Sequence, residues 1–310
     1  MIDPLEGFDP HAETTLFLME EAGRRGHEIL ALTLPDLTFR SCSIWGRGTW
    51  VKILGVGRRP FYRSLREASV DLATLDALFL RKDPPFDLSY LHHLYLLQQI
   101  RGKVFMMNDP TGIMKASEKI IPMDFPRYMP DVVVTRDFRE VERFAKSKRL
   151  GVVLKPLDGQ GGRGIFYLKP GDSNLKVAFE TLSSEGRVYV MAQDFLPEVK
   201  RGDKRVMVLN GEVLGYFTRL PRPGEHRANL HRGGRLKPCG LNSRELRIAR
   251  EVGIALREEG LYFVGLDLIG EKLTEVNVTS PMGINEVNRT MKIRSEKKVI
   301  DFVEDKLRRM

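Results

Sequence analysis

Residues 155–168 read "KPLDGQGGRGIFYL", and this glycine-rich stretch constrains the fold more than any other part of the chain. Gly159, Gly161 and Gly164 give the spacing GxGxxG, which in a dinucleotide-binding fold opens a helix whose N-terminus holds a pyrophosphate. Here the apolar run "GVVLKPL" precedes the glycines, and "IFYL", a β-branched and aromatic run, follows them. The pattern therefore predicts a loop between two strands, which excludes the dinucleotide fold. Neither GxxxxGKS nor GxxxxGKT occurs in the sequence, so a P-loop is excluded as well.

A glycine-rich loop between strands can fold over a triphosphate, because backbone N–H groups without side chains approach phosphate oxygens closely. Lys155, just ahead of the loop, would add a positive charge. The alternative is a mobile hairpin tip beside a surface lysine. The loop alone does not decide between the two.

A second pattern, which is rich in oxygen-bearing side chains, lies about 110 residues further along the chain, in "GLDLIGEKLTEVNV". The apolar spacing predicts two strands joined at Gly270-Glu271. Glu275 and Asn277 are two residues apart and therefore share one face of the sheet, and Asp267 can lie beside them on the neighbouring strand. Carboxylate and amide oxygens are the ligands that Mg²⁺ prefers. A polar face turned to solvent is the alternative.

The remaining patterns predict an α/β protein. In residues 1–112, helical patterns such as "TTLFLMEEAGRRGHEI" alternate with short apolar runs such as "LDALFLR", which is typical of a parallel sheet. "MIDPLEG" reads as the turn after a first strand, but almost no strand precedes it. "KASEKIIPMDF" predicts a short helix, and "RVMVLNGEVLGYFTRL" predicts a hairpin with a type I′-like turn at Asn210-Gly211.

Composition narrows the class of protein. The chain has 310 residues, 42% of them hydrophobic and 29% charged, as expected for an ordinary globular protein. It has no apolar run long enough for a membrane helix and no secretory pattern at its start. Its two cysteines fit neither a disulfide framework nor a zinc site, so we expect a cytoplasmic location. The net charge of +9 is spread along the chain without a nucleic-acid-binding module, and we expect neither a nucleic-acid nor a membrane partner.

Five motifs, in order along nearly the whole chain, closely resemble those of the prokaryotic glutathione synthetases, an ATP-grasp family: "LRKDPPFD", "LKPLDGQGGRGIF", "GDKRVMV", "FVGLDLIG" and "LTEVNVTSP". The resemblance implies an ATP-grasp fold in three parts. These are an N-terminal, substrate-binding, parallel-sheet (pre-ATP-grasp) domain at 1–112, a central lid subdomain at 113–192 and a C-terminal mixed-sheet subdomain with the metal site at 193–310.

The resemblance also implies a reaction. ATP phosphorylates the free carboxylate of γ-glutamylcysteine, the amine of glycine attacks the acyl phosphate, and ADP and phosphate are released. The cofactors implied are ATP and Mg²⁺, with Mn²⁺ as a possible substitute. The implied assembly is a homo-oligomer, either a dimer or a tetramer.

Matching the motifs assigns a role to individual residues of this sequence. The nucleotide contacts implied are Lys119 and Lys155 on the phosphates, Gly161 and Gly162 over them, Gln193, Asp194, Phe195 and Leu196 at the adenine, and Asp203 at the ribose. The catalytic arginines are Arg205 and Arg219, which would hold the phosphoryl group and a substrate carboxylate, a task that suits the planar guanidinium. The substrate contacts are Arg81, Arg227 and Asn229, and the metal ligands are Asp267, Glu275 and Asn277.

The sequence departs from the family on the substrate side. After "NVTSP" the family usually continues "T-x-I-R-E-I", whereas this chain has "MGINEVNRT", with Asn285 in place of the usual arginine and Arg289 one helical turn further on. The alternative function is therefore another ATP-grasp carboxylate–amine ligase with a different acid or amine. A binding protein without catalysis, or a basic nucleic-acid binder that merely keeps the fold, are further alternatives.

Overall fold

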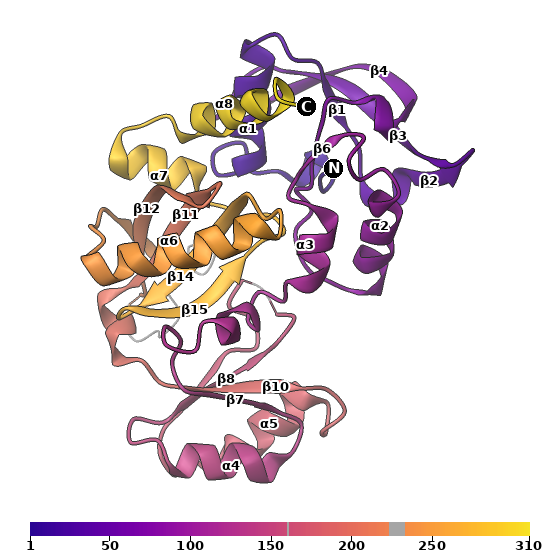
Figure 1. Ribbon diagram of the computed structural model, residues 1–310. Coiled ribbons are helices and arrows are strands. Elements are labelled where there is room, and N and C mark those ends of the chain that lie inside the picture. Colours follow the sequence, from indigo (N-terminus) through magenta and orange to yellow (C-terminus); the bar gives the residue numbers. More distant parts are fainter. Residues whose placement is uncertain (160, 223–232) are drawn as a thin grey trace.

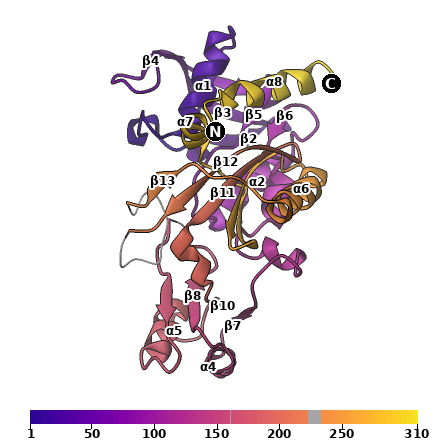
Figure 2. The same ribbon diagram turned by 90° about the vertical axis from the view of Figure 1, so that its left-hand side faces the viewer.

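The computed structural model describes residues 1–159, 161–222 and 233–310. Three α/β parts lie one above another in Figure 1, with the N-terminal part at the top, a five-stranded sheet in the middle and a four-stranded sheet at the bottom. Figure 2 shows the lower sheet and its two helices, α4 and α5, at the far end of the molecule from α1 and α8. Among the described residues, no helix combines the length and apolar character needed to span a membrane.

The N-terminal part holds two sheets. The parallel pair β5 (Ala77–Phe79) and β6 (Phe105–Met107) is flanked by α1 (Thr14–Arg24), α2 (Leu88–Gln98) and α3 (Pro110–Lys115). The second sheet is antiparallel, with β1 (Ile29–Ala31), β3 (Ser43–Ile53) and β2 (Leu37–Arg40) in this order and β4 (Tyr62–Asp71) also on β3. The prediction of a parallel sheet is thus right for β5 and β6 and wrong for residues 29–71.

The antiparallel sheet escaped prediction because much of it is exposed and carries little apolar patterning. Most residues of β4 are exposed, so its sequence "YRSLREASVD" has no buried face to mark a strand. Within β3, Gly48 lies where a Cβ atom would come within 2.6 Å of the Ala31 carbonyl oxygen, so a glycine permits the close approach of β1.

The central part is an antiparallel sheet in the order β7-β10-β8-β9, formed by β7 (Val132–Thr135), β10 (Val190–Asp194), β8 (Val152–Pro156) and β9 (Phe166–Leu168). Helices α4 (Phe138–Lys146) and α5 (Leu175–Ser183) cover one face of it (Figure 1). Because β8 and β9 pair directly, the glycine-rich loop joins two antiparallel strands, as predicted.

The C-terminal sheet has the order β13-β12-β11-β14-β15 and is antiparallel throughout. Its strands are β11 (Asp203–Leu209), β12 (Glu212–Leu220), β13 (Arg235–Lys237), β14 (Phe263–Ile269) and β15 (Lys272–Asn277), and α6 (Ser243–Glu258) packs on it. Asn210 and Gly211 have φ of 52° and 86°, as a type I′ turn requires, which confirms the predicted hairpin.

The short helix predicted around Lys119 is wrong. Helix α3 ends at Lys115, because Ala116 is extended, and a 3-10 turn at Ile121–Asp124 begins with Pro122 in its first turn. Proline lacks the N–H that a continuing α-helix would need, so the chain turns at residues 117–120 and carries Lys119 on that turn.

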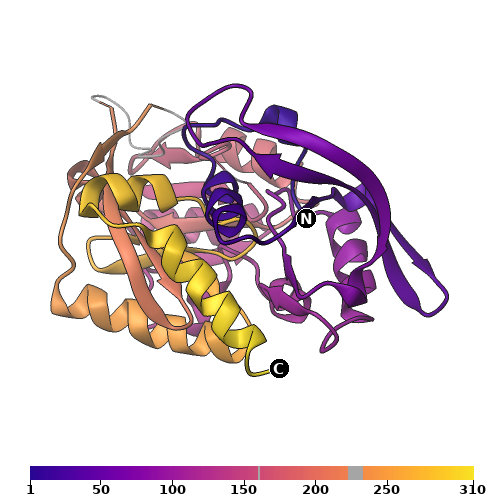
Figure 3. The ribbon, with the colours of Figure 1, turned by 90° about the horizontal axis from the view of Figure 1, so that it is seen from above.

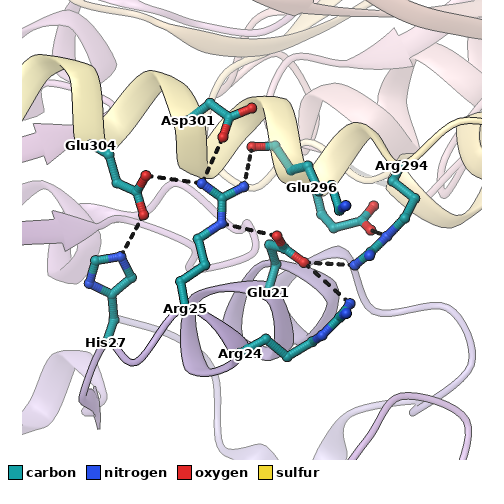
Figure 4. Close-up of polar contacts among 9 residues, drawn as sticks. Glu21, Arg24, Arg25, His27, Arg294, Glu296, Asp301 and Glu304 are labelled. Atoms are coloured by element: carbon teal, nitrogen blue, oxygen red, sulfur yellow. Dashed lines mark hydrogen bonds and ion pairs between the residues drawn. The ribbon is translucent and has the colours of Figure 1, made fainter.

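The chain returns to its beginning through α7 (Ile284–Met291) and α8 (Ser295–Leu307). Helix α8 packs along α1, and Figure 4 shows Arg25 at the centre of the polar contacts between them. Its guanidinium donates to Glu21 at 3.0 Å, Asp301 at 2.7 Å and Glu304 at 3.0 Å. A charged hydrogen-bond network therefore ties the two ends of the chain together.

The division of the chain at 112 and 192 remains a prediction. Strand β10 (Val190–Asp194) pairs with β7 and β8 and crosses the second of these positions.

Candidate active site

A cavity of about 180 Å³ lies between the central sheet and the C-terminal sheet. It brings together most of the residues that the sequence singled out: Lys119, Lys155, Gly161, Gly162, Gln193, Phe195, Leu196, Asp203, Arg205, Arg219, Asp267, Glu275 and Asn277. Residues that are up to about 160 positions apart along the chain thus line one cavity. A common nucleotide and metal site requires this proximity.

Two lysines enter the cavity from the side of the central sheet. Lys155 is on β8, and its ammonium donates to Gln193 Oε1 at 2.8 Å and to the Thr274 carbonyl oxygen at 3.4 Å. Lys119 donates to the carbonyl oxygen of Gly159 at the start of the glycine-rich loop and lies 3.3 Å from Glu275 Oε1. Both side chains are nearly buried, so their charges act in a setting poor in water.

Burial lowers the pKa of Lys155 from 10.5 to about 8, and the neighbouring Lys119 acts in the same direction, while Glu275 opposes the shift. Burial deprives the ammonium of water. A phosphate bound beside it would replace the lost hydration with a charge–charge interaction, so the site favours an anion.

Two arginines and two aspartates form a continuous row across the C-terminal sheet. In the strand register Asp203 pairs with Arg219, and Arg205 pairs with Asp267, so all four side chains lie close together. Arg205 holds Asp267 with two hydrogen bonds, Nε to Oδ1 at 2.5 Å and Nη2 to Oδ2 at 3.0 Å. Arg219 contacts Asp203 and lies 2.9 Å from Asp267 Oδ1.

The same row leaves two buried atoms without a partner among the described residues, Asp203 Oδ1 and Arg219 Nε. An acceptor and a donor that are buried and unpaired cost free energy unless a ligand satisfies them. They therefore mark where a hydroxyl and an anionic oxygen could bind.

Burial by itself would raise the pKa of Asp267, but Arg205 and Arg219 outweigh it and bring that pKa down to about 2. Burial raises the pKa of Asp203 even though Arg219 opposes the shift. Asp267 is thus held as a carboxylate at any ordinary pH.

The three predicted metal ligands share one sheet face. Asp267 is the direct register partner of Glu275, and Asn277 Nδ2 lies 3.4 Å from Asp267 Oδ2. The described residues contain no group of three His, Cys, Asp or Glu side chains that would hold a metal alone. Two carboxylates and an amide nevertheless fit Mg²⁺, which usually binds through one or two carboxylates plus substrate phosphates and keeps several waters.

The adenine-side residues divide into two groups. Gln193, Phe195 and Leu196 line the cavity, and the Phe195 ring stacks on Tyr167 with centroids 4.0 Å apart. Asp194 is not among the lining residues, and its N–H donates to the Asp131 carbonyl oxygen at 2.9 Å. Asp194 is therefore placed as part of β10 and not as a wall of the cavity.

Arg81, one of the three predicted substrate contacts, is not among the residues that line this cavity. Arg81 is buried in the N-terminal part, where it donates to Thr15 Oγ1 at 3.2 Å and to the Pro281 carbonyl oxygen at 3.1 Å. Arg227 and Asn229 lie outside the described residues.

Among the lining residues that sequence reasoning missed, Glu118 is the acidic one. Glu118, directly before Lys119, accepts hydrogen bonds from the Val278 N–H at 3.3 Å and Thr279 Oγ1 at 3.1 Å. Burial, and secondarily the like charge of Glu275, raises its pKa to about 7. The only sequence signal was its place beside Lys119, and the short helix predicted there gave no reason to turn Glu118 inward.

Comparison with solved structures shows that the fold is shared with ATP-grasp proteins. The ATP-grasp ligase PsnB in complex with a minimal precursor matches with a TM-score of 0.63 at 16% identity, covering 98% of this chain and 97% of that one. D-cycloserine synthetase DcsG matches with a TM-score of 0.57 at 15% identity, over 76% of this chain and 86% of that one.

Sequence comparison then gives the family. The model of the prokaryotic glutathione synthetase N-terminal domain matches residues 1–114, and that of its ATP-grasp domain matches residues 118–292. Glutathione synthetase of Vibrio cholerae is 39% identical over 310 residues, covering 99% of this chain and 97% of the relative. That of Synechocystis is 37% identical over 313 residues, with 98% of both chains covered. The chain belongs to the prokaryotic glutathione synthetase family of ATP-dependent carboxylate–amine ligases, as the motifs predicted.

Proposed function

We propose that this chain joins glycine to γ-glutamylcysteine in the cavity between its central and C-terminal sheets. The observation that carries the proposal is the composition of that cavity, where two lysines, two arginines and the carboxylate hairpin face the same space. Phosphoryl transfer needs positive charge around the moving group and fixed positions for the reactants, and this wall supplies both. The predicted cytoplasmic location and homo-oligomeric state stay predictions.

Each group of residues has a distinct task in this proposal. Lys119 and Lys155 hold the phosphates, and the glycine-rich loop covers them with N–H groups. The unpaired Asp203 Oδ1 accepts a hydrogen bond from a ribose hydroxyl. The unpaired Arg219 Nε donates a hydrogen bond to a phosphoryl or carboxylate oxygen. Asp267, Glu275 and Asn277 would hold Mg²⁺ or Mn²⁺, which would neutralise charge on the phosphates when bound.

In this proposal Arg205 positions other groups of the site. It fixes the Asp267 carboxylate with two hydrogen bonds, and its Nη1 donates to the Met282 carbonyl oxygen at 3.0 Å. Arg205 thereby keeps a metal-ligand candidate and the loop after β15 in one arrangement. We retain Arg81, Arg227 and Asn229 as proposed acceptor contacts.

The decisive test measures ADP release with γ-glutamylcysteine and glycine supplied together and singly. We expect turnover only with both, and a product with the mass of glutathione. ADP release at an unchanged rate when either substrate is left out would contradict the proposal.

A different acid–amine pair is the second candidate, and one observation favours it. Asn285, which replaces the usual arginine, donates through Nδ2 to the His11 carbonyl oxygen at 2.8 Å and so braces the N-terminal segment. A panel of other dipeptides and amines in the same assay would identify such a pair by faster ADP release than with γ-glutamylcysteine and glycine.

A further inference from the structure

The acidic side chains of the candidate active site are not equally compensated by positive charge. Four of them line the cavity: Glu118, Asp203, Asp267 and Glu275. Asp203 and Asp267 form ion pairs with arginines, and Glu275 lies 3.3 Å from the ammonium of Lys119. Glu118 forms no ion pair with a residue that the structure describes. Within the described part of the chain, Glu118 is thus the carboxylate of this cavity that has no basic partner.

The two carboxylate oxygens of Glu118 differ in their surroundings. Oε1 accepts hydrogen bonds from two uncharged donors, the Val278 N–H at 3.3 Å and Thr279 Oγ1 at 3.1 Å. The Glu118 carbonyl oxygen accepts from the Val276 N–H at 2.9 Å, so backbone and side chain together fix the residue against the end of β15. No hydrogen bond from the described residues reaches Oε2. One oxygen therefore orients the carboxylate, and the other is available to a ligand in the cavity.

A carboxylate in this position favours a positively charged ligand. Glu118 is held by neutral donors and is largely removed from water, so a cation beside it would replace the hydration that burial takes away. The phosphates of a nucleotide carry the wrong charge for such a partner. An amino acid, which is the amine substrate of the proposed reaction, brings an ammonium group.

The place of Glu118 in the fold favours this ammonium group over a metal ion. Thr279 begins the segment after β15 that leads to the N-terminal part, where the Gly283 N–H donates to Thr14 Oγ1 at 3.0 Å. Burial, and after it the charge of Glu118, raises the pKa of the Tyr90 hydroxyl on α2, so the carboxylate is close to the N-terminal part. Figure 3 shows that part, in indigo and purple, beside the C-terminal helices, in orange and yellow. Glu118 thus lies where the cavity borders the part that carries a proposed acceptor contact.

We propose that Glu118 binds the ammonium group of the amine substrate through Oε2 and so selects an amino acid as the second substrate. The inference rests on the proposed ligase function and adds to it the residue that recognises the amine. Oε1 stays with Val278 and Thr279 while Oε2 accepts a hydrogen bond from the ammonium. The recognition is charge-assisted, which makes it stronger than a hydrogen bond between neutral groups.

The test compares the wild type with Glu118→Gln, whose amide oxygen can still accept the hydrogen bonds from Val278 and Thr279. We expect the KM for glycine to rise by about 10- to 100-fold, the loss typical of one hydrogen bond to a charged group. The KM for ATP should stay within about twofold, because Glu118 does not bind the nucleotide. Glu142→Gln, on the exposed face of α4, is the matched control and should leave every kinetic constant unchanged.

Hydroxylamine separates recognition of the charge from support of the site, because it is uncharged at neutral pH. Its nitrogen bonds to the acyl carbon while the bond from that carbon to the phosphate oxygen breaks, and a proton passes from nitrogen to water. We expect wild type and Glu118→Gln to form the hydroxamate at rates within about twofold of each other. If Glu118→Gln does not fold, Glu118→Asp replaces it and should raise the KM for glycine at least about threefold, with the hydroxylamine rate again unchanged.

Three results would overturn the inference. An equal loss of activity with glycine and with hydroxylamine would show that Glu118 only supports β15. A higher Mg²⁺ requirement with an unchanged KM for glycine would make Glu118 a metal ligand, and an unchanged KM for glycine alone would remove it from the amine site. Failure of the proposed function is distinguishable, because the wild type would then use an amine other than glycine. In that case the same comparison is made with that amine.

Discussion

At the scale of single residues, Lys155 is the clearest case of a charge whose role depends on burial. It lies in the cavity wall with Gln193 as its nearest partner, and no aspartate or glutamate is hydrogen-bonded to it in the described part of the chain. The Lys155→Met variant keeps a long unbranched side chain but removes the charge. We expect kcat to fall by about 10²–10³, the loss typical of one fixed electrostatic group. Lys176→Met, on the exposed face of α5, is the control and should retain full activity.

The pH dependence of ATP binding follows from the same lysine. Its pKa is about 8 in the free protein, so the ammonium is present below that pH and is lost above it. We therefore expect kcat/KM for ATP to fall as the pH rises through 8, and Lys155→Arg to remove this limb because arginine stays protonated. A profile for Lys155→Arg that declines at the same pH as the wild type would disprove the assignment to Lys155.

Stability should change with pH in the opposite sense. The folded pKa of about 8 is lower than the ordinary value of 10.5, so folding disfavours the charged form. This cost is complete below about pH 8 and disappears as the pH rises to 10.5. Relative to the wild type, Lys155→Met should thus be most stable below pH 8 and lose that advantage between pH 8 and 10.5. Thermal unfolding of both proteins at pH 7, 9 and 10 would reveal it, and a constant difference in Tm would speak against it.

At the scale of elements, the glycine-rich loop depends on backbone conformation rather than on packing. Gly161 has a φ of +64°, and a Cβ atom at this position would meet nothing within 4 Å. Gly161→Val is therefore expected to distort the loop and raise the KM for ATP, with little change in Tm. Gly171→Val is a matched control, because Gly171 has a φ of +74° and equally open surroundings but lies outside the cavity. Equal kinetic effects of the two substitutions would show that the loop does not cover the nucleotide.

The sequence predicted those elements whose signals are local. The turns at Asn210-Gly211 and Gly270-Glu271, and the strands that flank the glycine-rich loop, needed only neighbouring residues and a two-residue alternation. The antiparallel sheet at residues 29–71 was missed because much of it is exposed and lacks an alternating apolar pattern. The inward position of Glu118 was missed because its partners Val278 and Thr279 are 160 and 161 residues away. Arg81 shows the same limit, since its partner Pro281 is 200 residues away.

At the scale of the whole molecule, the contacts of Arg25 join the first helix to the last. Its side chain is 21% exposed and serves Glu21, Asp301 and Glu304 together, whereas the neighbouring Arg24 is 58% exposed with one longer contact. We expect Arg25→Met to lower the Tm by about 2–4 °C, because Glu21, Asp301 and Glu304 each lose one of their hydrogen-bond donors. Arg24→Met is the control and should melt as the wild type does. An equal Tm for Arg25→Met would show that the helices pack without these ion pairs.

Hydrogen bonds from two parts of the molecule hold the loop after β15. Arg205, at the nucleotide cavity, donates to the Met282 carbonyl oxygen, and Arg81, in the N-terminal part, donates to the carbonyl oxygen of Pro281 next to it. A ligand that draws Arg205 toward itself must therefore pull on a loop whose adjacent peptide unit is held by Arg81 of the N-terminal part. Reciprocity follows: whatever factor ATP applies to the affinity for the acceptor, the acceptor applies to the affinity for ATP. ATP is titrated with and without saturating acceptor, and the acceptor with and without saturating ATP, and both pairs of titrations should give the same ratio of affinities. Arg81→Met should bring that ratio toward one.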